Sequence, residues 1–382
     1  MNEPAAAVPA LTTARIDAVI CVHTATRPVE RAVASALQNR APLRVTVIAH
    51  NTDINAIATR LGPLANDSRV RLLELRDGVR SPANAFNFGI EVSRAEFFSL
   101  IGSDDELAPG ALDAWLALAD RAAADVVIAP IRRAGGGGVP SPRVRPGRVA
   151  PLDGDRDRLF ERAAPLGLIR LARFPGLRFT SGIPRGVDQV FSVHLWFAGA
   201  AVAFDASLPP YIEWDDQADR VTHGHTPLAD DVAYLGAMES DDVFRAMRPA
   251  ARRAVAAKLL RVHVIGAIAR RVADEGLTVA DRAVVVDTVA RLRGWARGLD
   301  GLLAWRDRRA LHAAMDEATT TGQLRRALGD RTRYITPGAL LTVNPLRILH
   351  RHAPLRSLAA GVRVARAVAH SIEEPSDEEG RR

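Results

Sequence analysis

The first third of the chain alternates short apolar runs with longer amphipathic stretches. Apolar, β-branched runs predict strands at 16–22, 43–49, 70–75, 96–102 and 124–131. Between these runs, apolar residues recur every three or four positions and predict helices at 27–38, 53–65, 82–93 and 108–122. Strands alternating with helices of this length indicate βαβ units and a mainly parallel, Rossmann-like sheet. Ligands of such sheets bind beyond the carboxyl ends of the strands.

The pattern changes twice further along. Four consecutive glycines and three prolines in RRAGGGGVPSPRVRPGR rule out a regular element, so 133–148 is expected to be a flexible link or mobile loop. Shorter mixed elements follow to about residue 240, and helical periodicity fills 241–370. The domains expected are therefore an α/β unit over 14–240, with halves 14–132 and 149–240, and a helical unit over 241–370. Segments 1–13 and 371–382, the latter acidic, are expected to be disordered.

Composition narrows the functional classes. The single cysteine, Cys21, excludes a disulfide framework and fits a reducing compartment. No apolar stretch of about 18 uncharged residues and no basic N-terminal signal appear, so we expect a cytoplasmic protein. The net charge of +7 comes from 241–370, which holds 24 basic and 11 acidic residues. No nucleic-acid motif accompanies this charge, and nucleic acid is not expected as a partner.

The basic helices of the C-terminal segment allow two interpretations. The stretches 248–273 and 344–371 combine arginines with an aliphatic face. Such helices can simply pack on the α/β unit. They can also make peripheral contact with anionic membrane lipid, or with a polyanionic acceptor, through their arginines. They further offer a surface for self-association into an oligomer.

Two adjacent acids stand out because they follow an apolar strand. Asp104 and Asp105 come directly after FFSLIGS, at the edge where ligands bind. Two neighbouring carboxylates repel each other unless a cation or hydrogen-bond donors compensate, and Mg²⁺ or Mn²⁺ on a nucleotide diphosphate is the usual cation. The alternative is an acidic cap of the helix that begins near Pro109. On this stretch alone the two interpretations stay open.

Longer stretches resemble a known family. The segment GVRSPANAFNFGIEVSRAEFFSLIGSDDELAPGALDAWLALA resembles family 2 glycosyltransferases of the GT-A fold, which place a Gly-rich turn, an Asn-containing helix, a strand and acids in this order. VICVHTATRPVERAVASALQN is similar to the opening of that family, and the region from LIRLARF to DRVTH is similar to its later part. The resemblance covers about 14–225 and is closest to polymer-modifying members such as teichoic-acid glycosyltransferases.

The resemblance implies an activity and roles for the acids. The chain would transfer a sugar from a nucleotide-diphosphate sugar to a hydroxyl of a cell-envelope polysaccharide, teichoic-acid-like polymer or lipid-linked glycan, with inversion. Asp104 would be the principal metal ligand, and Asp105 would orient the ribose, the metal or its waters. Asp188 would be the general base, because attack at an anomeric carbon needs a carboxylate on the acceptor side. Its alternative role is an N-cap of the helix that follows it.

The resemblance also implies further binding residues. The expected donor-binding set is Thr24, Arg27, His50, Asn51, Arg80, Asn87, Asp105 and Arg220, and His223 joins Asp104 and Asp105 as a metal ligand. Arg220 and His223 fall where the family has a segment that reaches back over the diphosphate. Each is alternatively a solvated loop residue.

The chain departs from the family pattern at several acids. Ala49 replaces one of the acids after the second strand, Gly102 replaces the first aspartate of DxD, and Val187 replaces the glutamate of ED. These changes keep a second hypothesis open, a catalytically lapsed GT-A domain that acts as a glycan- or membrane-binding scaffold. A nucleotidyltransferase is disfavoured because VHTATRP lacks the glycines of a phosphate loop.

Overall fold

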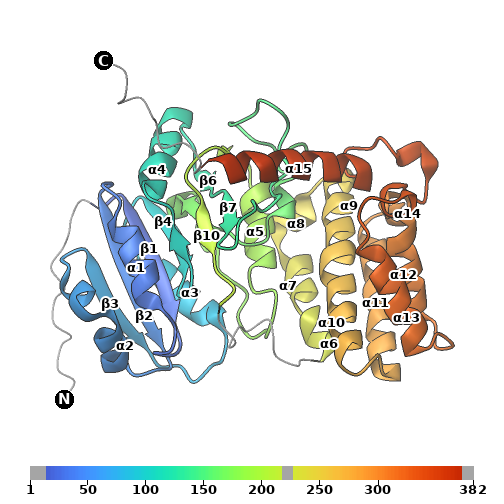
Figure 1. Cartoon of the computed structure of the whole chain (residues 1–382), viewed down its shortest axis with the longest axis horizontal. Helices are drawn as coiled ribbons and strands as arrows, with labels where there is room; N and C mark the ends of the chain where they lie inside the picture. The colour runs from blue at the N-terminus through green and yellow to red at the C-terminus, as the bar shows by residue number, and fades with distance from the viewer. Residues whose placement is uncertain (1–13, 217–226, 372–382) are drawn as a thin grey trace.

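The computed structural model describes residues 14–216 and 227–371. It contains an α/β half followed by a helical half (Figure 1). The expected disordered ends and the candidate residues Arg220 and His223 lie outside the described residues.

A seven-stranded, mainly parallel sheet forms the frame of the α/β half. Its strands lie in the order β3-β2-β1-β4-β8-β6-β9. The pairs β3-β2, β2-β1, β1-β4 and β6-β9 are parallel, and β8 is antiparallel to both of its neighbours. The strands are β1 (Ile16–Val22), β2 (Leu43–His50), β3 (Val70–Leu75), β4 (Phe97–Gly102), β6 (Val126–Ile128), β8 (Gly167–Ile169) and β9 (Val202–Ala203).

Helices cover both faces of this sheet because β1 is apolar on both. Ile16, Ala18 and Ile20 of β1 pack in one apolar cluster, which takes in α1, α2 and α4. Val19 faces the opposite cluster, which takes in α3 and α5. Strands buried on both faces are typical of parallel sheets. The bounds are α1 (Val29–Leu37), α2 (Ile54–Leu61), α3 (Pro82–Val92), α4 (Ala111–Ala122), α5 (Gln189–Phe197), and the 3-10 turns η1 (Gly62–Asn66), η2 (Leu159–Glu161) and η3 (Leu171–Arg173).

The apolar run 124–131 forms part of two strands. Pro130 separates β6 from β7 (Ile131–Arg133), because proline has no N–H for a sheet ladder. β7 joins a small second sheet with β5 (Glu106–Leu107) and β10 (Tyr211–Glu213), in the order β5-β10-β7. This sheet brings the residues that follow the acid pair beside residues 211–213.

The helical half packs around one apolar cluster that reaches into the α/β half. Phe160, Val190 and Val193 share this cluster with side chains of the C-terminal helices. The elements are α6 (Leu228–Asp231), α7 (Tyr234–Ser240), α8 (Asp242–Ala246), α9 (Pro249–Lys258), the π-helical turn η5 (Leu259–Val264), α10 (Ile265–Asp274), α11 (Val279–Trp295), η6 (Leu299–Leu302), α12 (Trp305–Met315), α13 (Thr321–Arg331), α14 (Pro337–Leu340), η7 (Pro345–Arg347) and α15 (Pro354–His370). None of the described helices is long and apolar enough to cross a membrane.

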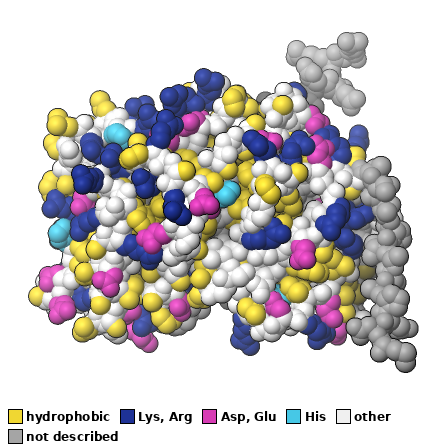
Figure 2. Space-filling model, turned by 180° about the vertical axis from the view of Figure 1, so that it is seen from behind, with side chains coloured by type: hydrophobic (Ala, Val, Ile, Leu, Met, Phe, Trp, Pro, Cys, Tyr) yellow, Lys and Arg dark blue, Asp and Glu magenta, His cyan; other side chains and the backbone are white. Residues whose placement is uncertain are grey.

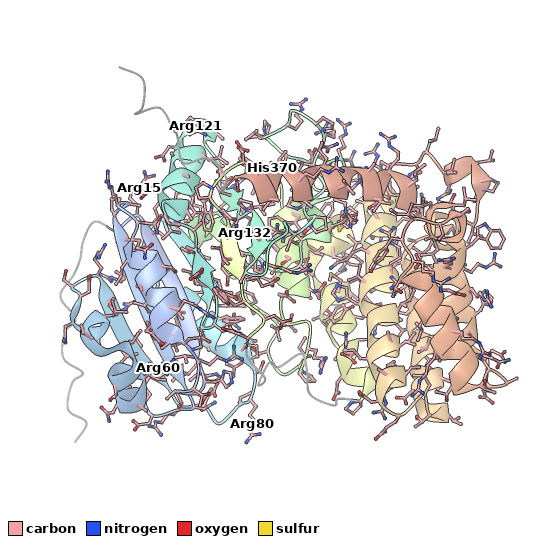
Figure 3. The ribbon with its side chains drawn as sticks, viewed as in Figure 1. Arg15, Arg60, Arg80, Arg121, Arg132 and His370 are labelled. Atoms are coloured by element: carbon pink, nitrogen blue, oxygen red, sulfur yellow. The ribbon has the colours of Figure 1, made fainter. Side chains whose placement is uncertain are left out.

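The last helix, α15, returns to the α/β half and lies on segment 133–148. A Cβ on Gly138 would collide with the Ala365 carbonyl oxygen, and one on Gly361 would lie 2.9 Å from Arg143 Nε. Gly138 therefore allows close contact between two backbones, and Gly361 leaves room for the Arg143 side chain. Figure 3 shows Arg15, where the strands begin, and His370 at one edge of the molecule, with Arg80 at the opposite edge.

The fold class expected from the sequence is confirmed. The first four strands and the four helices of the first third are present, the fifth expected strand is divided into β6 and β7, and the single helix expected over 248–273 is the continuous run α9-η5-α10. Helices α6 and α7 lie before residue 241 and were not expected, whereas α13 lies inside the helical region expected over 241–370. The sequences of α6 and α7 are short or weakly periodic, and α13 begins at a Thr320–Gln323 capping box inside a polar stretch.

Candidate functional site

The acid pair lies in the tight turn after β4, and arginines of the first helix region hold it. Arg27 Nη1 lies 2.6 Å from Asp104 Oδ2, and both side chains are about nine-tenths buried. Arg31, on α1, donates to the backbone carbonyl of Asp104. A buried ion pair of this kind compensates the charge that the turn would otherwise bury alone. Two expected site residues, Arg27 and Asp104, are therefore in contact.

Asp105 is held by the segment that enters the small sheet. Its Oδ2 accepts from the Tyr211 hydroxyl at 2.6 Å, and its Oδ1 accepts from the backbone N–H of Trp214 at 2.9 Å. Burial raises the pKa of Asp105 to about 6, with a smaller contribution from the negative charge of Asp104, while these two hydrogen bonds act in the opposite direction. The helix-cap alternative does not describe this pair, because α4 begins after Gly110 with no side-chain cap.

Gly102 leaves the space that Asp105 occupies. A Cβ at position 102 would collide with Asp105 Oδ2 and lie 3.1 Å from the Tyr211 hydroxyl oxygen. The Gly102 N–H donates to that same oxygen at 2.8 Å. Gly102, Asp105 and Tyr211 thus form one unit, and the missing first acid of the family pattern leaves room for the second.

Arg31 connects the acid pair to the segment that precedes the undescribed residues. Its guanidinium lies 4.3 Å from the centre of the Trp214 ring and 2.9 Å from Asp216 Oδ2. A cation over an indole face and a carboxylate on the same guanidinium restrain the arginine from two sides. Segment 211–216 therefore lies over the acid pair, and Arg220 and His223 follow it in sequence.

At the end of β2, His50 and Asn51 share one partner. His50 Nε2 and Asn51 Nδ2 each lie 2.9 Å from Asp77 Oδ1. Burial raises the pKa of Asp77, but hydrogen bonds from the Val79 N–H, Asn84, Asn51 and His50 outweigh it and hold the pKa below its usual range. Asp77 therefore brings a carboxylate to the edge where the family pattern has acids and this chain has Ala49 and His50.

Three further residues expected to bind the donor, Thr24, Arg80 and Asn87, differ in exposure and in hydrogen-bond partners. Thr24 lies in the turn after β1 and accepts from the Thr26 N–H at 3.3 Å. Arg80 is exposed in the segment between β3 and α3 (Figure 3). Asn87 donates to the Phe179 carbonyl at 3.0 Å and accepts from the Phe179 N–H at 2.8 Å, so its amide holds segment 179–181 in place.

Asp188 lies at the start of α5 and connects to the helical half. It occupies the N-cap position, but its side chain makes no cap hydrogen bond. Gln189 Nε2 donates to Asp188 Oδ1 at 3.2 Å, and Lys258 Nζ, from α9, donates to Gln189 Oε1 at 2.8 Å. This Asp188-Gln189-Lys258 chain leaves the carboxylate available for roles other than capping.

The charges around Asp188 act on its proton affinity. Burial raises the pKa of Asp188, and the ammonium group of Lys258 acts against that rise. Burial also lowers the pKa of Lys258 to about 8. Tyr234 lies near Asp188, and its hydroxyl is buried without a hydrogen-bond partner among the described residues. A buried carboxylate with a raised pKa, close to an ammonium group with a lowered pKa, is typical of proton-transfer sites.

Several residues of this site were not expected from the sequence. Arg31, Asp77 and Tyr211 each contact an expected residue. Lys258 reaches the expected residue Asp188 through Gln189. Lys258 had one signal, because it is the single lysine of the chain and lies between apolar residues of an amphipathic helix. The sequence around Arg31, Asp77 and Tyr211 holds no pattern that would have indicated a role in the site.

The acid pair supplies few ligands for a metal ion by itself. Within residues 14–216 and 227–371, no three His, Cys, Asp or Glu side chains group so as to hold one. Mg²⁺ typically takes one or two protein carboxylates and completes its shell with water and substrate phosphates. Asp104 and Asp105 supply two carboxylates, a number that fits this mode of Mg²⁺ binding.

Comparisons with known proteins find a matching family model and similar solved structures. Residues 17–179 match the family model described as glycosyl transferase family 2. The chain is similar to crystal structures of S. aureus TarS 1-349 in complex with UDP-GlcNAc (TM-score 0.59, 14% identity, 84% of this chain and 92% of that chain) and with UDP (TM-score 0.60, 14% identity, 84% and 93%). A longer S. aureus TarS structure matches with TM-score 0.61 and 14% identity, over 83% of this chain and 55% of that one. A search of curated proteins finds no match.

Proposed function

We propose that the protein transfers a sugar from a nucleotide-diphosphate sugar to a hydroxyl of a cell-envelope polysaccharide, teichoic-acid-like polymer or lipid-linked glycan. The match of residues 17–179 to the model of glycosyltransferase family 2 and the GT-A fold of the chain support this proposal. The observation that most supports it is the acid pair after β4, which lies inside the matched segment and is held from both sides by Arg27 and Tyr211. We also propose the α/β unit as 14–240 and the helical unit as 241–370, working at the cytoplasmic face of the membrane.

The proposed donor site follows the carboxyl ends of β1, β2 and β4. Arg27 and Arg80 would contact the diphosphate, because guanidinium groups match phosphate oxygens in geometry and charge. His50, Asn51 and Asp77 would meet the base, and a uridine base is our first choice because S. aureus TarS binds UDP-GlcNAc and UDP on a similar fold. Thr24, Asn87 and Arg220 complete the proposed set.

The proposed reaction needs one proton acceptor. Asp188 would take the proton of the acceptor hydroxyl while its oxygen attacks the anomeric carbon and the nucleoside diphosphate leaves, which inverts the configuration. Gln189 would orient the carboxylate by its hydrogen bond, and Lys258 would hold Gln189. Asp188 is the single candidate base among the described residues, which supports a single displacement.

A divalent ion is part of the proposal. Asp104 and Asp105 would hold Mg²⁺ or Mn²⁺, with His223 as a further ligand, and the ion would supply charge neutralisation at the leaving diphosphate. Arg27 already neutralises Asp104 in this structure, so we expect Arg27 to move toward the phosphates when donor and ion bind together.

The proposal can be tested by sugar transfer and donor binding. UDP-, GDP- and dTDP-sugars are screened with Mn²⁺ for a rise in melting temperature, since a ligand that binds the native state stabilises it. The best donor is then followed by product formation with wild type, Asp104→Ala and Asp188→Asn. We expect Asp104→Ala to lose donor binding and turnover. We expect Asp188→Asn to bind the donor and lose at least a hundredfold in turnover.

Asp242→Asn is the matched control, because that side chain is 94% exposed on α8. It is expected to behave as wild type. If both site variants turn over like wild type, the site assignment is wrong. If wild type binds no nucleotide with or without Mn²⁺, the scaffold hypothesis replaces the enzyme.

A further inference from the structure

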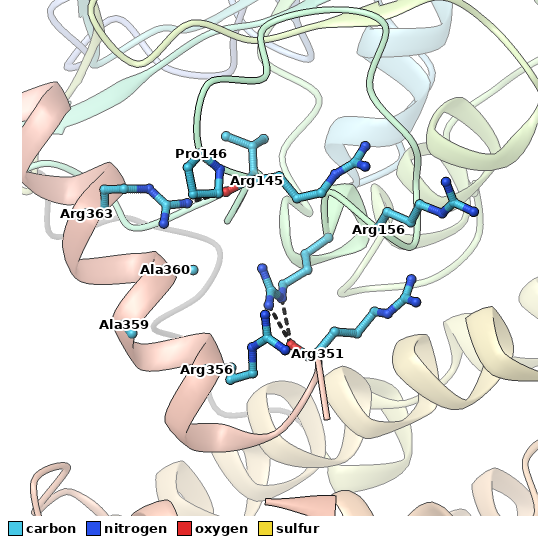
Figure 4. Close-up of a pocket in the computed structure, with 10 residues that line it drawn as sticks. Arg145, Pro146, Arg156, Arg351, Arg356, Ala359, Ala360 and Arg363 are labelled. Carbon is cyan, nitrogen blue, oxygen red and sulfur yellow. Dashed lines mark hydrogen bonds between the residues drawn. The ribbon is translucent and has the colours of Figure 1, made fainter. Parts of the chain in front are cut away.

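An arginine-lined pocket lies between α15 and segment 144–158, away from the acid pair (Figure 4). It encloses about 540 Å³. Six arginines line it: Arg145, Arg156, Arg158, Arg351, Arg356 and Arg363. They come from the α/β half, from the turn before α15 and from α15 itself, so the pocket exists only where the two halves meet.

Carboxylates neutralise only part of this charge. Arg145 lies 2.7 Å from Asp157 Oδ2, and Arg351 lies 3.1 Å from Asp155 Oδ2. Arg158, Arg356 and Arg363 instead donate to backbone carbonyl oxygens, which fix the side chains without cancelling their charge. Arg158 is 5% exposed, and burial lowers its pKa. The carboxylate of Glu161 acts against that lowering only in part, and an anion in the pocket would further offset the cost of the buried guanidinium.

Exposed apolar side chains flank the same pocket. Leu346 is 93% exposed and Leu349 69% exposed, both just before Arg351. Within the described residues, seven of the twelve large hydrophobic side chains that are exposed belong to 334–362, so they concentrate at this end of the molecule. Figure 2 shows arginine side chains gathered at the upper edge over the C-terminal half, with hydrophobic side chains beside them. Such a concentration marks an interaction surface.

The outer face of α15 continues this surface. Leu355 and Val362 are exposed on it, and Arg356, Arg363 and Arg366 lie beside them at helical spacing. No acidic residue occurs anywhere in α15. Its inner face is small and apolar and is buried on the α/β half, through Ala360, Gly361, Val364 and Val368. The exposed face thus combines aliphatic groups and positive charge without any negative charge.

We propose that α15, the preceding turn 341–353 and the arginine pocket bind the surface of a membrane that contains anionic phospholipid. Leu346 and Leu349 enter the headgroup region, and the pocket takes the phosphate of a lipid headgroup between its guanidiniums. Arginines give attraction to anionic lipid, and exposed leucines give apolar insertion, which are the two contributions that peripheral membrane binding combines. A soluble polyanion would use the arginines but leave the exposed leucines without a role.

The experiment uses the full chain and vesicles of defined composition. Sedimentation is measured with phosphatidylcholine vesicles and with vesicles that also contain phosphatidylglycerol, at low and at physiological salt. We expect binding only with phosphatidylglycerol, weakened by salt. Arg356→Gln/Arg363→Gln should lower the partition coefficient about 30-fold, which is about fivefold for each arginine near an anionic surface. Leu346→Ser/Leu349→Ser should lower it at least tenfold with all arginines present.

Controls separate this proposal from its rivals and from the glycosyltransferase assignment. Arg297→Gln/Arg326→Gln removes the same charge from exposed positions outside the pocket and should retain more of the binding. Melting temperature and donor binding check that each variant is folded. Absence of binding by wild type to phosphatidylglycerol vesicles overturns the proposal, as does binding that survives both pocket and leucine variants. Binding of soluble polyphosphate without vesicle binding also overturns it and assigns the pocket to a soluble anion. If the protein binds phosphatidylglycerol vesicles but no nucleotide-sugar donor, the glycosyltransferase proposal fails and the membrane proposal stands.

Discussion

Lys258 is the residue through which the helical half reaches the proposed base. It lies at the end of α9, directly before the π-helical turn η5, and is 5% exposed. Its ammonium group acts against the rise that burial causes in the pKa of Asp188. The proton affinity of the proposed base is therefore set partly by a residue of the helical half, and both residues lie outside the family-matched segment 17–179.

The first residue-scale prediction concerns Lys258→Met. Loss of the positive charge should raise the pKa of Asp188, so that the carboxylate is protonated over a wider acidic range. A general base works only when deprotonated, and the acidic limb of kcat/KM should therefore move to higher pH by about one unit. A pH profile of transfer measures this shift. Arg245→Met, at a side chain 67% exposed on α8, is the control. An unmoved limb, or an equal loss at every pH, would show that Lys258 acts only in packing.

Gly102 supports a second prediction. Restoring the acid of the family pattern with Gly102→Asp should not create a second metal ligand, because its Cβ would collide with Asp105 Oδ2 and crowd the Tyr211 hydroxyl. We expect lower transfer activity and a loss of about 1–3 kcal/mol in the free energy of unfolding, as overpacking usually costs. Activity assays and urea titration measure both. Gly135→Asp, where a Cβ meets nothing within 4 Å, is the control. A more active Gly102→Asp enzyme would refute this account.

At the residue scale, the sequence predicts where side chains emerge but not which partners they meet. Asp104 and His50 follow apolar strands, so their place at the sheet edge could be predicted. Their partners could not, because Tyr211 lies 106 residues from Asp105, and Lys258 lies 69 residues from Gln189. Such contacts depend on how the halves pack, and local periodicity carries no information about that packing.

At the scale of elements, proline and glycine explain most differences between expectation and structure. Pro130 divides one apolar run between two sheets, which periodicity alone could not predict. Segment 133–148, expected as a link or mobile loop, carries an isolated bridge between Arg132 and Gly138 and lies against α15. Of its glycines, Gly138 allows contact with the backbone of α15, and Gly136 and Gly137 adopt the positive φ angles of the turn.

This contact gives an element-scale prediction. Gly138→Ala should push α15 away from the α/β half, because its Cβ would collide with the Ala365 carbonyl and lie 2.7 Å from Val368 Cβ. We expect the free energy of unfolding to fall by about 1–3 kcal/mol and the amides of α15 to exchange faster. Urea titration and hydrogen exchange measure these effects. Gly135→Ala, three residues away with open space around it, should change neither. Equal behaviour of the two variants would mean that α15 does not depend on this contact.

At the scale of the whole molecule, the two halves share their cores. Phe160, Val190 and Val193 of the α/β half are buried among the C-terminal helices, while Val364 and Val368 of α15 are buried in the sheet's cluster. Each half therefore covers apolar surface of the other. In the described residues the last strand ends at Glu213 and the helical half begins with α6 at Leu228, earlier than the change of periodicity near residue 241 indicates.

The shared cores predict one cooperative unfolding transition. The double variant Trp295→Phe/Trp305→Phe retains three tryptophans, all in the α/β half: Trp115, Trp196 and Trp214. Their fluorescence then reports that half, while circular dichroism follows the helices. We expect both signals to change at the same urea concentration, as in a two-state transition. Two separated midpoints would show that the halves unfold independently.

The position of α15 has a consequence for the geometry of sugar transfer. It lies at the edge where the strands begin, and the acid pair and His50 follow the ends of the strands, toward the edge that carries Arg80 (Figure 3). If α15 rests on a bilayer, the edge that carries the proposed donor site points away from the lipid. An acceptor sugar one or two units from its lipid anchor would then be out of reach. This orientation favours a long glycan chain that extends from the membrane around the enzyme over a short lipid-linked acceptor.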